Sequence, residues 1–183
     1  KARVAEAFYK SNYHFAILMK NKAIFLDRDG VINFERGDYN LCVDDFVVNE
    51  GVGEAIALLK QHGFRVLVIS NQAAISRGLL SFDVVEAMHD KLKKHLELFG
   101  TAVDEIYYCP HHESVTRCLC RKPSPLFIEK AVSRFGLDVR QSYFIGDRER
   151  DIEAAAAAGV KGILIESNYR LPDLCKQIVL GKL

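Results

Sequence analysis

Two carboxylates lie two residues apart in the stretch Asp27-Arg28-Asp29-Gly30, which directly follows the apolar run 23–26. In an extended segment, residues i and i+2 share a face. Both acids can therefore point into one crevice at the end of a strand, where open α/β sheets bind ligands. Two close anions repel each other unless one takes a proton or a cation lies between them. The pattern predicts a cation site, although an Asx-turn after a strand explains this motif equally well when it is seen alone.

Three further polar stretches follow predicted strands. Ser70-Asn71-Gln72 offers a hydroxyl and loop amides that can hold a phosphoryl oxygen, and Arg121-Lys122-Pro123 places two cations before a predicted helix. In Gly146–Asp151, the second acid lies one helical turn after the first. Taken alone, Ser70-Asn71-Gln72 is more often a turn, and Arg121-Lys122-Pro123 is more often a solvated charge pair. Together they provide the carboxylates, the nucleophile, the acid/base and the neutralising cation that phosphoryl transfer needs.

A separate candidate site is the cysteine-rich loop. Cys109-Pro-His111 and Cys118-Leu-Cys120 supply three sulfurs and one imidazole, a set that suits tetrahedral Zn²⁺ with a closed, structural ligand shell. Spacing alone leaves His112 open as the fourth ligand in place of His111. The loop is polar and could not otherwise bury three thiols, so free core cysteines are the weaker interpretation. We expect the zinc to brace the loop and to take no part in the chemistry.

Composition narrows the function classes. The 183 residues are 49% hydrophobic and 27% charged with a net charge of +1, which is typical of a soluble globular domain and gives no reason to expect nucleic acid or a membrane as partner. The clustered thiols favour a cytoplasmic protein, and we expect a monomer that acts on a small-molecule phosphate ester. Residues 1–18 are interpreted as an added segment or the tail of an upstream domain. Residues 19–183 are predicted to form one domain.

Strand and helix patterns alternate along the chain, which predicts an α/β fold with a doubly wound parallel sheet of the Rossmann type. The spacing of the motifs leaves no room for a large cap domain. His62, His89 and His95 are expected at the surface. The predicted strands are Lys22–Asp27, Phe64–Ser70, Val103–Cys109, Gln141–Gly146 and Val160–Ile165. The predicted helices are Gly51–Gln61, Ser81 (N-cap) to Leu98, Ser124-Pro125 (cap, then Pro at the first helical position) to Phe135, Glu149–Ala158 and Leu171–Leu180.

With D-x-D-G at 27–30, Ser70, Lys122 and G-D-x-x-x-D at 146–151, the chain resembles the haloacid-dehalogenase-type phosphatases over roughly residues 22–165. The stretches F-L-D-R-D-G-V-I-N, S-N-Q-x-x-I-x-R-G and C-x-C-R-K-P resemble the branch that contains histidinol-phosphate and heptose-bisphosphate phosphatases. The resemblance implies Asp27 as the nucleophile that forms an aspartyl phosphate and Asp29 as the general acid and base. It implies Mg²⁺ held by Asp27, the Asp29 backbone carbonyl and Asp147.

The same resemblance implies that Ser70 and Lys122 hold the transferring phosphate. Substrate contacts are implied for Asn71, Gln72, Ala73, Arg121 and Arg148 and, in the first loop, for Glu35, Arg36, Gly37 and Asp38. The implied substrate is a small sugar phosphate, heptose 1,7-bisphosphate, with histidinol phosphate as the alternative. An alternative of another class is an inactive, zinc-braced phosphate-binding module. The presence of both acids of the D-x-D-G motif disfavours it, because an inactive copy has no chemical need for the second acid.

Overall fold

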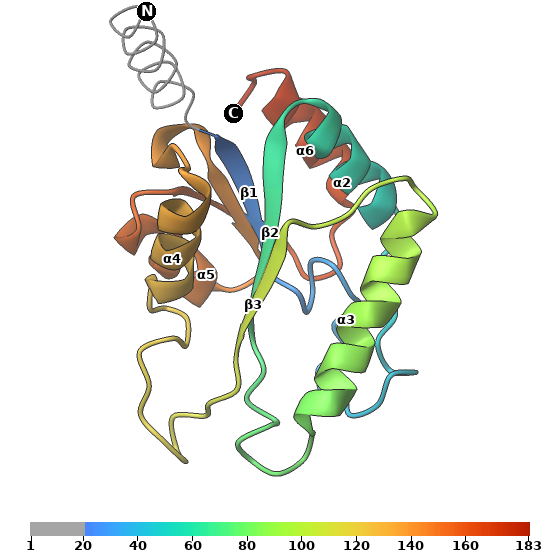
Figure 1. Ribbon diagram of the computed structural model, residues 1–183, viewed down its shortest axis with the longest axis vertical. Coiled ribbons are helices and arrows are strands. Elements are labelled where there is room, and N and C mark those ends of the chain that lie inside the picture. The colour runs from blue at the N-terminus through green and yellow to red at the C-terminus, as the bar shows by residue number, and fades with distance from the viewer. Residues whose placement is uncertain (1–20) are drawn as a thin grey trace, which may run out of the picture.

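A computed structural model describes residues 21–183 and shows five parallel strands in the order β3-β2-β1-β4-β5 (Figure 1). The predicted doubly wound α/β sheet is confirmed. The strands are β1 (Lys22–Leu26), β2 (Phe64–Asn71), β3 (Glu105–Cys109), β4 (Tyr143–Gly146) and β5 (Lys161–Leu164). Because all strands run in the same direction, their carboxyl ends meet at one edge of the sheet, and the polar stretches of the sequence follow these ends.

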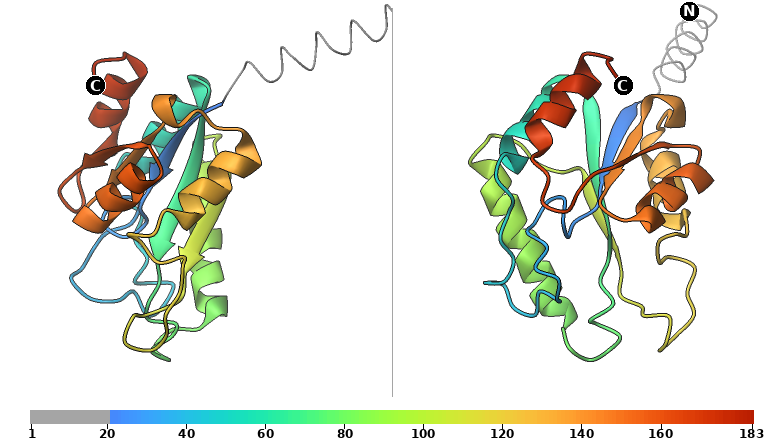
Figure 2. Two further views of the ribbon diagram at one scale, coloured as in Figure 1. Left: turned by 90° about the vertical axis from the view of Figure 1, so that its left-hand side faces the viewer. Right: turned by 180° about the vertical axis from the view of Figure 1, so that it is seen from behind.

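Helices cover both faces of the sheet. In Figure 1, α2 (Val52–Gln61), α3 (Phe82–Glu97) and α6 (Leu171–Val179) lie to the right of it, and α4 (Leu126–Phe135) and α5 (Glu149–Ala157) lie to the left. The two views of Figure 2 show the same two layers of helices. None of these helices, within residues 21–183, is long and apolar enough to cross a bilayer.

The central strand β1 explains why the run before the first acid pair is uniformly apolar. Ile24 and Leu26 belong to the core shared with α2, α3 and α6, whereas Ala23 and Phe25 belong to the core shared with α4 and α5. All four side chains are fully buried. A parallel strand with a helix layer on each face has no solvent side, so it cannot show an alternating pattern.

Most element boundaries fall within two residues of the prediction, and the differences have local causes. Ser81 caps α3 as predicted, because its Oγ accepts a hydrogen bond from the Val84 amide (3.3 Å). Helix α4 begins one residue later than predicted, with Pro125 as its N-cap. Strand β3 begins only at Glu105, because the Asp104 carboxylate accepts a hydrogen bond from the backbone N–H of Val66 (2.7 Å) and ends the sheet pairing there.

The boundary at the start of β4 also differs from the prediction. The strand predicted from Gln141 begins at Tyr143, and residues Val139–Gln141 form a 3₁₀ turn instead. The Asp138 carboxylate caps this turn by accepting a hydrogen bond from the backbone N–H of Arg140 (3.1 Å). A short polar side chain thus competes with the strand for the same backbone.

The expectation of a surface position is wrong for His89, which is only 2% exposed. It lies on α3 four residues after Val85 and three before Leu92, on the stripe that faces the core. Its ring packs edge-on against Tyr108 with 5.3 Å between ring centroids. Burial, together with the charge of Arg28, lowers the pKa of His89 to about 4, so the imidazole is neutral near pH 7.

Candidate active site

The acids of the first and last motifs lie side by side, because β1 and β4 are neighbours in the sheet. Asp27 follows β1, Asp147 follows β4, and Asp151 lies in the first turn of α5. Each of the three offers a carboxylate oxygen within 4.8 Å of the other two. The fold therefore brings together acids that are more than a hundred residues apart in the sequence.

Lys122 lies between two of these acids, Asp27 and Asp151. Its Nζ is 2.8 Å from Asp27 Oδ1 and 2.8 Å from Asp151 Oδ1, and it donates a hydrogen bond to the Ile69 carbonyl (2.7 Å). The ammonium group therefore bridges the two acids, and its hydrogen bond to Ile69 fixes its position. The side chain is 1% exposed, so its charge acts in a medium of low dielectric and strongly attracts anions nearby.

The charge of this cluster is incompletely balanced by protein groups. Three carboxylates against the buried ammonium of Lys122 and the more exposed guanidinium of Arg148, 3.4 Å from Asp147, leave a formal charge of −1 when all are ionised. Burial raises the pKa of Asp27 to about 7; Lys122 opposes this shift and the charge of Asp151 adds to it. A divalent cation with oxygen ligands fits both the charge and the donor set of Asp27, Asp147 and Asp151.

Asp29, the second acid of the motif, is surrounded by hydrogen-bond donors. Its carboxylate accepts hydrogen bonds from Arg28 Nη2 (2.8 and 3.1 Å), from Gln72 Nε2 (2.8 Å), and from the amides of Asn33 and Asn40 (3.0 Å each). Burial favours the neutral acid, but the Arg28 guanidinium and the amides outweigh it and hold the pKa of Asp29 below its ordinary value. In this arrangement Asp29 is ionised and can accept a proton.

Residues at the end of β2 contact both Asp29 and Lys122. Gln72 Nε2 donates to Ser70 Oγ (2.7 Å) as well as to Asp29. Asn71 pairs through its side chain with the backbone of Lys122, accepting from its N–H (3.0 Å) and donating to its carbonyl (3.2 Å). In this structure Asn71 and Gln72 therefore position other residues of the site. Ala73 is buried behind them.

The remaining predicted substrate contacts form a rim of more exposed residues. Arg148, whose side chain is 48% exposed, lies 3.4 Å from Asp147 and 4.0 Å from Glu35. Glu35 Oε1 accepts a hydrogen bond from the Gly37 amide (2.7 Å). Arg36 forms an ion pair with Asp45 at the outer part of the same loop. Asp38 is exposed there and accepts a hydrogen bond from the amide of the next residue (2.7 Å).

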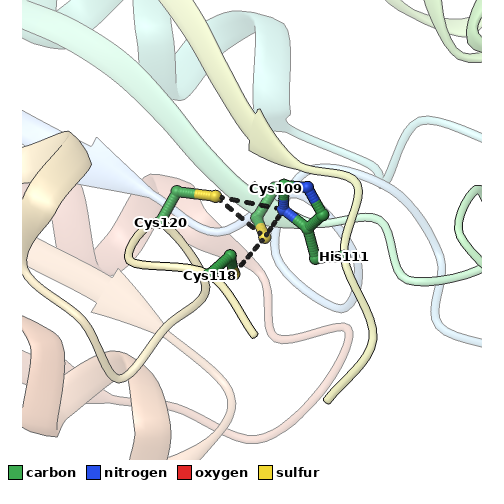
Figure 3. A group of neighbouring side chains, drawn as sticks. All are labelled: Cys109, His111, Cys118 and Cys120. Atoms are coloured by element: carbon green, nitrogen blue, oxygen red, sulfur yellow. Dashed lines mark hydrogen bonds between the residues drawn. The ribbon is translucent and has the colours of Figure 1, made fainter. Parts of the chain in front are cut away.

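The cysteine loop brings its predicted ligands together beside the end of β3 (Figure 3). Cys109 Sγ lies 3.2 Å from Cys120 Sγ, 3.6 Å from Cys118 Sγ and 3.5 Å from His111 Nδ1. A tetrahedral zinc with Zn–S bonds of about 2.3 Å requires edges of about 3.8 Å between its ligand atoms, close to these distances. His112 bonds instead to Ser114 (2.7 Å), so the geometry selects His111 from the two histidines.

The cysteine cluster and the acid cluster are joined through the backbone. Arg121 and Lys122 directly follow Cys120, and Arg121 Nη1 donates to the carbonyl of His111 (3.2 Å). We therefore expect a displacement of the cysteine loop to disturb Lys122. Burial raises the pKa of the Cys109 and Cys120 thiols, so a bound metal must displace their protons.

Several residues of this region were not identified from the sequence, including the two asparagines that donate to Asp29. Arg28 was given no role, yet it is 1% exposed and its guanidinium carbon lies 5.4 Å from the ring centroid of Phe46. A charged residue inside a buried motif was the available signal. Ser167 and Asn168, in the link before α6, contact Asp147 and Glu35. No sequence pattern indicated them.

A parallel α/β sheet with a D-x-D-G turn, a buried lysine and two further acids at its carboxyl edge defines a haloacid-dehalogenase-like phosphatase. A family model described as HAD-hydrolase-like matches residues 119–178. A D-glycero-D-manno-heptose-1,7-bisphosphate 7-phosphatase from Chlorobaculum tepidum is 37% identical over 85% of this chain and 84% of its own length. The corresponding β-anomer enzyme from Haemophilus ducreyi is 39% identical over 78% and 81%. The chain belongs to this family of heptose-bisphosphate phosphatases.

Solved structures agree with this assignment. The crystal structure of D,D-heptose 1,7-bisphosphate phosphatase from B. bronchiseptica, complexed with magnesium and phosphate, superimposes with a TM-score of 0.82. It is 30% identical, and the match covers 87% of this chain and 99% of that one. A HAD-like phosphatase from Mesorhizobium loti gives a TM-score of 0.78 at 28% identity, covering 88% and 87%. The chain is thus a phosphatase, and the alternative of an inactive phosphate-binding module is set aside.

Proposed function

We propose that the protein is a Mg²⁺-dependent phosphatase that hydrolyses D-glycero-D-manno-heptose 1,7-bisphosphate through an aspartyl phosphate. The observation that carries the chemistry is the buried ammonium of Lys122, 2.8 Å from both Asp27 and Asp151, within a cluster of three acids. The substrate is proposed from the names of the relatives. The clustered thiols support a reducing, cytoplasmic location.

Asp27 is the nucleophile. Its Oδ1 accepts hydrogen bonds from the Arg28 backbone N–H (2.7 Å) and pairs with Lys122, so Oδ2 is the oxygen we expect to attack phosphorus. The ester oxygen leaves and takes a proton from Asp29. Asp29 then takes a proton from water, the water oxygen attacks the phosphorus of the acyl phosphate, and inorganic phosphate leaves as Asp27 is restored.

The donors around Asp29 set a condition on the first step. They favour the carboxylate, which is the form needed for activating water. To donate a proton to the leaving oxygen, Asp29 must be protonated and must give up one of these donors. Gln72 is the donor that can compensate most readily, because its amide already has a second partner in Ser70.

Metal ions have two separate roles in this proposal. A Mg²⁺ ion held by Asp27, Asp147 and the Asp29 backbone carbonyl would neutralise charge on the phosphoryl oxygens. Zn²⁺ held by Cys109, His111, Cys118 and Cys120 would fix the loop that carries Arg121 and Lys122. Ser70 Oγ and Lys122 Nζ would hold the transferring phosphate.

The rim supports a bisphosphate over a cationic substrate. Arg148, beside Asp147 and Glu35, and Arg121, next to Lys122 in the chain, are cations that would attract a second phosphate and would repel the amine of histidinol phosphate. The test is steady-state hydrolysis of three substrates, with and without Mg²⁺: an aryl phosphate, heptose 1,7-bisphosphate and histidinol phosphate. We expect Mg²⁺-dependent turnover of all three and the highest kcat/KM for the bisphosphate. Preference for histidinol phosphate would replace the substrate proposal, and absence of aryl phosphate turnover would remove the chemical one.

A further inference from the structure

Asn168 ties together two distant parts of the site. It lies in the link between β5 and α6 and has a φ of 67°, the only positive value of a non-glycine residue in the described part of the chain. Its backbone N–H donates to the Gly30 carbonyl (2.6 Å). Its side chain accepts from the Glu35 N–H (2.7 Å) and donates to the Glu35 carbonyl (3.2 Å). This two-way pairing imitates a short piece of β-ladder between the link and the first loop.

The same link also reaches the acid cluster. Ser167 Oγ donates to Asp147 Oδ2 (2.5 Å). Figure 2 (right) shows this link, which leads into α6, running beside the loop that follows β1. Two successive residues thus contact an acid of the proposed magnesium site and a residue of the proposed substrate rim. Neither residue belongs to a motif singled out in the sequence.

The position of Glu35 affects Arg148, its neighbour in the substrate rim. With its backbone held on both sides by Asn168, Glu35 directs its carboxylate toward Arg148, 4.0 Å away. Arg148 is also 3.4 Å from Asp147. Arg148, which borders the acid cluster, is therefore flanked by two carboxylates, and one of them depends on Asn168 for its place.

We propose that Asn168 is a positioning residue for substrate recognition, which holds Glu35, and through it Arg148, in the geometry that receives the second phosphate of the substrate. This inference rests on the proposed function. A loop that must be ordered at the moment of binding adds an entropic cost to binding, and the pairing with Asn168 removes that cost in advance. The effect belongs to substrate binding and not to the chemical step, because Asn168 contacts neither Asp27 nor Asp29.

The test uses two substitutions that leave the backbone relaxed. Asn168→Gly removes both side-chain hydrogen bonds and still adopts the positive φ. Asn168→Asp keeps the acceptor for the Glu35 N–H, loses the donor to the Glu35 carbonyl, and also tolerates this conformation. Asn21→Gly is the matched control, because Asn21 makes a single side-chain hydrogen bond to the Phe135 carbonyl (2.8 Å) at the opposite edge of the sheet.

For Asn168→Gly we expect kcat/KM for heptose bisphosphate to fall about 10-fold, mostly through KM, while kcat/KM for an aryl phosphate falls by less than about 2-fold. Asn168→Asp should give an intermediate value and Asn21→Gly the wild-type ratio. Glu35→Gln, which keeps the backbone pairing, should reproduce part of the loss. Equal losses on both substrates, or no loss on either, would overturn the inference.

A second measurement is independent of catalysis and separates failure of the inference from failure of the proposed function. Amide hydrogen exchange should show faster exchange at residues 35–37 in Asn168→Gly than in wild type or Asn21→Gly. Unchanged exchange there would refute the positioning role whichever substrate the enzyme prefers. If exchange rises while the wild-type enzyme does not hydrolyse the bisphosphate, the pairing stands and the substrate proposal is at fault.

Discussion

The acid cluster follows β1 and β4 and the cysteine cluster follows β3, all at the carboxyl edge of the sheet, but the two clusters balance their charges in different ways. Asp27 and Asp151 share the ammonium of Lys122, so the protein itself supplies part of the compensation. The cysteine cluster contains no comparable cation among its four ligands, and burial raises the pKa of two of its thiols. The first cluster is therefore assembled by the fold, whereas the second depends on a metal to become ionised.

Because of this difference, substitutions in the two clusters should affect different properties of the protein. Removing a charge from the acid cluster should change the reaction while the fold and the metal content of the cysteine loop remain. Removing a cysteine should first change stability, and activity should follow because Lys122 moves with the loop. Substitutions in each cluster therefore test whether activity and stability can be lost separately.

The largest effect is expected for Asp27→Asn, which keeps the shape of the nucleophile and removes its charge. We expect kcat to fall on the order of 10³-fold or more. Zinc content and thermal stability should stay close to those of the wild type. Burial already raises the pKa of Asp27 to about 7, so loss of this charge should cost the folded state little. Ordinary turnover by the purified variant would contradict the aspartyl-phosphate mechanism. Asp173→Asn, on the exposed side of α6, is the control.

The next effect is expected for Asp29→Asn, typically about 10²–10⁴-fold in kcat with little change in phosphate affinity. The substitution is geometrically mild. The new oxygen can keep the donors now bound to Oδ1, and Gln72 can turn its amide so that Oε1 accepts from the new NH₂ group and from Ser70 Oγ. If only KM changed, Asp29 would be a positioning residue and the acid/base assignment would be wrong.

The two clusters also differ in how well they can be predicted from the sequence. The cysteine ligands all lie between residues 109 and 120, so their spacing alone indicates a chelate, and only the choice between His111 and His112 needed the structure. The acid cluster joins Asp27 to Asp151, and its proximity depends on β1 and β4 being neighbours. The motifs indicated which residues to bring together, but the strand order supplied the contact.

Each residue position or element boundary that the sequence did not predict has a physical explanation. Arg28 and His89 are polar residues that lie in the core, where Arg28 packs on Phe46 and His89 on Tyr108, and composition assigns such residues to the surface. Asn168 acts through backbone groups of Glu35, and backbone groups leave no trace in a residue pattern. The β4 boundary shifted because the Asp138 carboxylate accepts a hydrogen bond from the backbone N–H of Arg140.

For the cysteine cluster we expect about one zinc per chain by elemental analysis, retained through dialysis against a moderate chelator. Cys118→Ser or Cys120→Ser should lose this zinc and several kcal/mol of stability. In a domain of this size each kcal/mol lowers Tm by about 2–4 °C. Because thiol protons must leave on binding, zinc affinity should rise with pH. Cys42→Ser, at an exposed thiol outside the loop, should change none of these quantities. A metal-free wild type with full stability and activity would show that the loop is held another way.

The smallest effect tests the junction between the two clusters, where Arg121 follows the last cysteine and precedes the site lysine. The Arg121 guanidinium donates a hydrogen bond to the His111 carbonyl, so the cysteine loop holds this group in place. Its positive charge can still attract a distant phosphate. Binding energy from that phosphate can lower the barrier at the reacting one.

We expect the wild type to prefer heptose bisphosphate over histidinol phosphate by about 10-fold in kcat/KM, or about 1.4 kcal/mol. Arg121→Ala should reduce this preference more than it slows aryl phosphate hydrolysis. Arg117→Ala removes an exposed cation of the same loop and should leave the preference intact. If Arg121→Ala instead slows all substrates equally and lowers zinc retention, Arg121 acts through the cysteine loop. The boundary between the catalytic and structural regions would then lie at Lys122.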